Sequence, residues 1–114
     1  MVTTTPSLQV TGAISGGLIS LTPGSSVDMN CDNGNSFILT PGQSCTITPS
    51  GGIAGQSLTL VVTTSGTVSR PLTFATPFKT SGTLSTGNSN AKKFVICFIY
   101  DGTNYIEKSR TAAL

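Results

Sequence analysis

The sequence predicts an all-β fold, a small antiparallel β-sandwich of the jelly-roll type, in a single domain covering residues 1–114. Short apolar runs rich in Val, Ile, Thr and Phe recur along the chain between clusters of Gly, Pro, Asn and Ser, which is the pattern of strands and turns. Helix-forming residues never gather at the 3.6-residue spacing of an amphipathic helix. A chain of this length can bury a core without metals or disulfides.

The first half of the chain contains several short alternating segments. Turn signals separate them: Asn-Gly within 31–36 favours a tight hairpin, and Pro-Gly within 40–43 favours a second turn. We expect the N-terminal 1–34 to supply the first strands or an extended arm. The strands expected in this half cover 8–10, 18–21, 27–31, 37–40 and 45–47.

The second half begins with a loop at 49–56 and a strand at 57–64. Residues 68–74 form a further expected strand, which Pro71 restricts to a sheet edge or a break. Phe78 and Leu84 are expected core residues in an irregular connection. A polar loop at 86–93 then leads to the last two strands, expected at 94–100 and 105–108 around an Asp-Gly-Thr-Asn turn.

The run Phe94–Tyr100 is apolar on both alternating faces, which is typical of a strand covered on both sides. We expect this strand to be central, with Phe94, Ile96, Phe98 and Leu60 in the core. The opposite face is expected to meet either another part of the chain or another chain.

The three cysteines fit buried, reduced thiols, although Cys31 and Cys45 could instead close a short disulfide loop. We expect Cys97 in the core. Reduced thiols indicate synthesis in a reducing cytoplasm.

The composition offers little for catalysis. The chain has no histidine and only four acidic residues, so an imidazole base and a His-containing triad are excluded. Residues 28–39 resemble a calcium loop, but the glycine comes one place late and Leu39 stands where the bidentate Glu is needed. No cysteine pair has C-x-x-C spacing. We therefore expect no enzyme activity, cofactor or metal.

The net charge of +2 comes from scattered residues, which does not predict nucleic-acid binding. No apolar run approaches the ~18 residues of a membrane span. The N-terminus does not have the pattern of a signal peptide.

Residues 35–110 resemble a β module of tailed-bacteriophage virion proteins. The resemblance rests on SFILTPGQSCTITP, on GGIAGQSLTLVVTTSGTVSRPLTFATPFK, and most specifically on FVICFIYDGTNYIEKSR. The turn in that family is commonly followed by Trp, where this chain has Tyr105. The family's module often ends a long fibre, whereas this chain starts at Met1 without a shaft, so we expect a free-standing virion protein.

The resemblance implies a capsid decoration, or cement, protein that binds the major capsid protein on the outer head surface as a homotrimer. It is expected to be made in the host cytoplasm. The N-terminal segment is expected either to reach a neighbour as an arm or to form a first strand of the same sandwich. The candidate subunit or capsid contacts are Leu8, Val10, Ala112, Ala113 and Leu114.

The alternative is a receptor-binding tail-fibre or tail-tip module that recognises a host surface glycan. In that case Tyr100, Tyr105 and the loop 86–93 are expected to face the ligand, although cross-strand pairing also accounts for the two tyrosines. A tail-tube or baseplate accessory domain is a third possibility. The sequence does not decide between head and tail.

Overall fold

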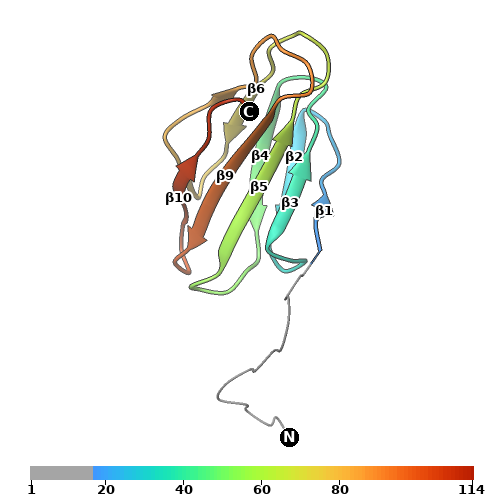
Figure 1. Ribbon diagram of the computed structural model, residues 1–114. Helices are drawn as coiled ribbons and strands as arrows, with labels where there is room; N and C mark the ends of the chain where they lie inside the picture. Colours follow the sequence, from blue (N-terminus) through green and yellow to red (C-terminus); the bar gives the residue numbers. More distant parts are fainter. Residues whose placement is uncertain (1–16) are drawn as a thin grey trace, which may run out of the picture.

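The computed structural model describes residues 17–114, and this part of the chain is all-β, with ten strands in two sheets and no helix (Figure 1). The six-stranded sheet has the order β1-β3-β5-β9-β10-β7, and the four-stranded sheet has the order β2-β4-β6-β8. The strands of the larger sheet are β1 (Ile19–Ser20), β3 (Ser36–Leu39), β5 (Ser57–Thr63), β7 (Phe78–Lys79), β9 (Lys93–Tyr100) and β10 (Tyr105–Arg110). Those of the smaller sheet are β2 (Ser26–Asn30), β4 (Cys45–Ser50), β6 (Pro71–Phe74) and β8 (Leu84–Ser85).

The chain passes from one sheet to the other at almost every turn, so that neighbouring strands in the first half are parallel. Strand β3 pairs with β1 and β5 in parallel, and β4 pairs with β2 and β6 in parallel. In this half, each strand from β2 to β5 connects two parallel strands of the other sheet. The arrangement is a short β-solenoid of stacked coils, and the expected antiparallel jelly-roll sandwich is corrected accordingly.

The turn at 31–36 is the local reason for this difference. It was expected to close a hairpin, but it carries the chain from β2 in the smaller sheet to β3 in the larger one. The Pro-Gly turn within 40–43 likewise leads from β3 across to β4. Both turns occur where predicted, but they join strands of different sheets.

The C-terminal half returns to antiparallel pairing. Strand β9 lies between β5 and β10 and pairs with both in antiparallel register, with an irregularity between Glu107 and Ser109. The hairpin around 101–104 and the central place of β9 are therefore confirmed. The strand expected at 68–74 begins only at Pro71, so the proline marks a break. Strand β6 lies between β4 and β8, so Pro71 is not at a sheet edge.

The core lies between the two sheets and is formed by the inward-facing residues of each strand. Phe94, Ile96, Phe98 and Leu60 are buried, as predicted, and so are Phe78 and Leu84. Full burial of a large apolar side chain contributes about 1.5–3 kcal/mol. The rings of Phe74, Phe78 and Phe98 meet at centroid distances of 5.0–5.8 Å near one edge of this core.

All three cysteines are free thiols in this structure. Cys31 and Cys45 are buried, as expected. Cys97 is only partly buried, because it lies on the outer face of β9 between the inward-facing Ile96 and Phe98. The prediction that Cys97 belongs to the core is therefore corrected: its position in the alternation places it outside.

Candidate functional site

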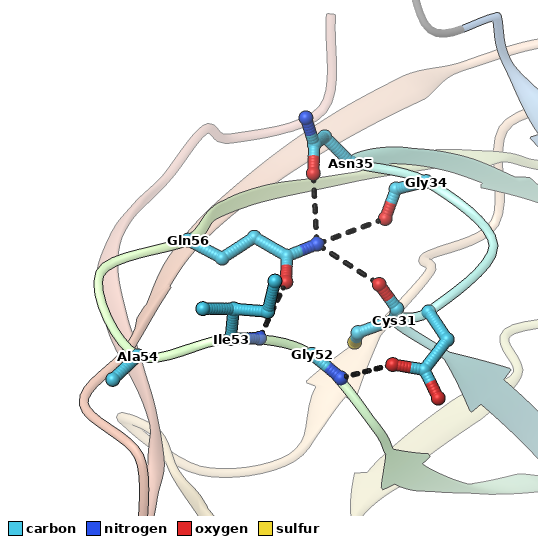
Figure 2. A pocket seen from close by; sticks show the side chains of 8 residues that line it. Cys31, Gly34, Asn35, Gly52, Ile53, Ala54 and Gln56 are labelled. Atoms are coloured by element: carbon cyan, nitrogen blue, oxygen red, sulfur yellow. Dashed lines mark hydrogen bonds between the residues drawn. The ribbon is translucent and has the colours of Figure 1, made fainter. Parts of the chain in front are cut away.

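Loops that connect the strands at one of their ends surround a depression of about 370 Å³ (Figure 2). One wall comes from the turn between β2 and β3, and the other from the turn between β4 and β5. The lining residues are Cys31, Asp32, Gly34, Asn35, Gly52, Ile53, Ala54 and Gln56.

The side-chain amide of Gln56 joins the two walls. Its Nε2 donates to the carbonyl oxygens of Cys31 at 2.9 Å and Gly34 at 3.2 Å, and to Asn35 Oδ1 at 2.8 Å. Its Oε1 accepts the Ile53 N–H at 2.9 Å (Figure 2). Because these bonds use both ends of the amide, Gln56 holds the loops in place and has limited capacity left for a ligand.

Asp32 makes a second connection between the walls. Its Oδ1 accepts the Gly52 N–H at 2.9 Å (Figure 2). The neighbouring Gly51 has a φ of 66°, and a Cβ added there would stand 2.6 Å from Asp32 Cγ. A side chain at position 51 would therefore strain the backbone and require the Asp32 carboxylate to move.

The two tyrosines lie at the same end of the molecule as the depression. Their rings stack at a centroid distance of 4.2 Å and an interplanar angle of 12°. The Tyr100 carbonyl accepts the Gly55 N–H at 2.6 Å, which ties β9 to the loop. Tyr105 is only 3% exposed, and its hydroxyl donates to the Gly51 carbonyl at 2.6 Å. Burial is the main reason that the pKa of Tyr105 rises to about 12.

Of the two tyrosines expected to face a ligand, the structure thus leaves only Tyr100 partly exposed. The loop 86–93 precedes β9, whereas Tyr100 ends it. At a rise of ~3.3 Å per residue, the two ends of β9 are about 23 Å apart. The loop 86–93 and the two tyrosines therefore do not form one surface.

The turn Asp101–Asn104 is held by its own first residue. Asp101 Oδ1 accepts the N–H groups of Thr103 at 2.8 Å and Asn104 at 2.6 Å. These bonds stabilise the carboxylate and lower the pKa of Asp101. The side chain therefore works as a turn former.

Two further ionisable side chains, Cys31 and Glu107, have shifted pKa values. Burial, and secondarily Asp32, raise the pKa of Cys31 to about 11, so its thiol stays protonated near neutral pH. Glu107 is bound by Arg110 at 2.7 Å, which lowers the pKa of this carboxyl and keeps it ionised. Within residues 17–114 no group of three His, Cys, Asp or Glu residues could hold a metal ion, and no helix is long and apolar enough to cross a membrane.

The outer faces of the two sheets differ sharply in chemistry. On the larger sheet Ile38, Val61 and Val95 form a row across β3, β5 and β9, because each is the register partner of the next. Ile99 and Ile106 form a second pair, with Cys97 between the rows. All six side chains are half-buried. We call them the outer apolar face.

The outer face of the smaller sheet is polar throughout β2 and β4. Its outward residues there are exposed, and they are Ser26, Asp28, Asn30, Thr46, Thr48 and Ser50. The contrast shows that the apolar character of the larger sheet is specific to that face.

The candidate contacts at the C-terminus are exposed. Ala112, Ala113 and Leu114 all lie at the surface, and Leu114 is 68% exposed. The backbone of Leu114 exchanges two hydrogen bonds with Lys93, at 2.9 and 3.0 Å, which fixes the end of the chain beside β9. Leu8 and Val10 lie outside the described residues.

Sequence reasoning missed Gln56 and Asp32 as the residues that join the loops. A signal was present in the segment GGIAGQ, where closely spaced glycines precede a polar residue at the start of a strand.

Comparisons of the chain with protein-family models, curated proteins and solved structures found no match.

Proposed function

We propose that this protein is a non-enzymatic structural protein of a bacteriophage virion, a decoration protein that binds the outer surface of the head as a homotrimer. The outer apolar face is the observation that carries this proposal. Half-exposed Ile and Val side chains from four neighbouring strands are unusual on a solvent-facing sheet and are typical of a protein contact surface. The phage assignment rests on the resemblance of residues 35–110.

The chemistry of this face suits a capsid contact. None of its six members is charged, and Thr59 and Lys93 lie beside them on the same face. Contact through the six apolar side chains depends little on salt. Each square ångström of apolar surface buried contributes about 25 cal/mol. Three linked copies also raise the overall affinity, because the second and third contacts form within one complex.

The first test is the copy number of the protein in purified virions, measured on a quantitative gel against the major capsid protein. A decoration protein is expected at hundreds of copies per particle. A handful of copies would move the protein to the tail and contradict the assignment to the head.

A variant pair then tests the surface itself. Val61→Asp places a charge at the centre of the outer apolar face, whereas Thr46→Asp places the same charge on the exposed face of the smaller sheet. We expect Val61→Asp to abolish binding to undecorated particles and Thr46→Asp to leave binding intact. Equal binding by both variants would exclude the outer apolar face as the contact.

A second candidate function, recognition of a surface glycan, is favoured by the loop depression. Asp32 lines this depression, and the partly exposed ring of Tyr100, which is not one of its lining residues, lies beside Gly52 in its wall. Aromatic rings and carboxylates are common sugar-binding groups. Glycan-array binding that is lost in Tyr100→Ala would support this function, and the absence of binding to any host-surface glycan would contradict it.

A further inference from the structure

Each sheet has an edge strand at the same side of the molecule, β1 in the larger sheet and β2 in the smaller one. Each of these two strands has a neighbouring strand on one side only. Within residues 17–114, β1 pairs only with β3, and β2 pairs only with β4. We call this side of the solenoid the open end. Open edges in β-proteins readily accept another strand.

The backbone of β2 is arranged to accept such a strand. The Ser25 carbonyl accepts the Thr46 N–H at 2.9 Å, and the Cys31 N–H donates to the Ser50 carbonyl at 2.7 Å. In a parallel ladder alternate residues bond to opposite neighbours, so the odd-numbered residues of this stretch face β4. The N–H and C=O groups of Ser26 and Asp28 and the N–H of Asn30 therefore face the open edge, whereas the Asn30 carbonyl accepts the Asn33 N–H at 3.1 Å.

A hollow of about 440 Å³ lies between the two open edges. Ile19, Leu21 and Phe37 contribute apolar side chains to its wall. Leu18, the residue before β1, is 54% exposed. Leu18 and Ile19 are thus less covered than the apolar residues of the inner coils, whereas Val27 and Met29 of β2 are fully buried.

A repeated turn shows what a neighbouring coil does for this structure. The sequence Leu-Thr-Pro-Gly occurs at 21–24 and again at 39–42, and the two turns lie against each other. Pro41 is fully buried, since β3 has coils on both sides. Pro23 occupies the same place in the first coil and is exposed. The first coil therefore lacks the outer neighbour that the second one has.

The chain contains a segment with the matching pattern. Thr-Pro pairs begin at positions 5, 22, 40, 48 and 76, and the first three are nearly equally spaced. Each of these three is followed by apolar residues that alternate with polar ones. Val27 and Met29 come five and seven residues after Thr22, as Cys45 and Ile47 do after Thr40, and Leu8 and Val10 come three and five residues after Thr5. In the second and third cases these residues point into the core.

We propose that the open end is a strand-acceptor site and that its occupant is the segment 4–10 of the same chain, added as one further coil. Leu8 and Val10 would then extend the inner row of Val27 and Met29, with Gln9 facing outward. Residues 11–18 would connect this coil to β1, as residues 31–35 connect β2 to β3. This inference is independent of the proposed function and of any capsid partner.

Amide hydrogen exchange on the full chain tests the proposal. A double variant, Leu8→Asp with Val10→Asp, places two charges on the inward side of the segment. Its matched control, Gln9→Asp with Thr11→Asp, places the same charges on the outward side. The probes are the backbone amides of Asp28 and Asn30, which face the open edge of β2. The backbone amide of Ile96 in the central strand β9 reports whether the domain remains folded.

We expect both probe amides to exchange slowly in the unmodified chain and in the control, and at least tenfold faster in Leu8→Asp with Val10→Asp, with Ile96 unchanged. Fast exchange in the unmodified chain, or equal exchange in the two variants, would overturn the proposal. The same-chain assignment would be overturned if the Asp28 and Asn30 amides lost protection on dilution and light scattering gave a mass above that of one chain. That result would identify a second copy of the chain as the donor of the strand.

Discussion

Replacing Glu107 by Gln tests how the two sheets are held together at the edge next to the C-terminal strand. The Glu107 carboxylate accepts two bonds from Arg110, at 2.7 and 3.0 Å, and one from the Ser81 hydroxyl at 2.8 Å. Arg110 in turn reaches the Gly82 carbonyl at 2.8 Å and lies 5.8 Å from the centroid of the Phe74 ring. The Glu107 side chain is only 7% exposed, so this ion pair is poorly screened by solvent.

The expected cost follows from these contacts. Hydrogen bonds to charged groups contribute about 1.5–3 kcal/mol each, and part of this is retained because Gln keeps one acceptor oxygen. Glu107→Gln should therefore lower the free energy of unfolding by about 2 kcal/mol. For a domain of this size that corresponds to a decrease in melting temperature of about 8 °C.

The pH dependence separates charge from packing. The hydrogen bond from Arg110 is the main reason that the pKa of Glu107 in the folded protein lies below its ordinary value of 4.5. A carboxyl with a lowered folded pKa contributes stability above the unfolded pKa and loses it as pH falls through the folded pKa. Urea denaturation should therefore show a difference between the unmodified chain and Glu107→Gln at pH 7 that shrinks as the pH falls through the lowered pKa of folded Glu107. A difference that stays the same size as the pH is lowered would refute the electrostatic explanation.

The remaining predictions concern the loop end and the thiols. Gly51→Ala should destabilise the fold by about 1–3 kcal/mol in thermal denaturation, because its Cβ would clash with Asp32 at a positive φ; unchanged stability would mean that this loop rearranges freely. Tyr105→Phe removes the bond to the Gly51 carbonyl and should cost about 1 kcal/mol, and a neutral result in the same assay would show that the hydroxyl is dispensable. Cys97 should react with a thiol reagent at pH 8 faster than Cys31, which is buried and whose pKa is about 11; mass spectrometry that finds Cys31 labelled first would contradict this.

Much of the strand pattern was readable from the sequence because a strand with one buried face leaves a period of two in its residues. Cys45 and Ile47 alternate with exposed threonines in β4, and Phe94, Ile96 and Phe98 do the same against half-exposed neighbours in β9. These alternations identify the inward side of each strand. They carry no information about which strand lies beside it.

The pairing was mispredicted for that reason. An Asn-Gly turn such as Asn33-Gly34 fits a hairpin, but here it connects β2 to a strand of the opposite sheet. The same limit applies to the site. Gln56 bonds to Cys31, Gly34 and Asn35, residues more than twenty positions away, which become neighbours only after the coils have stacked.

The three surfaces that carry the proposals are formed by different residues, and this makes their tests independent. The outer apolar face belongs to the middle strands of the larger sheet, the loop depression to the turns around Gln56, and the open end to the edges of β1 and β2. A charge at Val61 changes none of the residues that line the depression or the open end. Loss of particle binding in Val61→Asp, with slow exchange retained at Asp28 and Asn30, would therefore assign particle binding to the outer apolar face and not to the open end. Loss of binding in Leu8→Asp with Val10→Asp alone would mean instead that the N-terminal segment makes the contact in the particle.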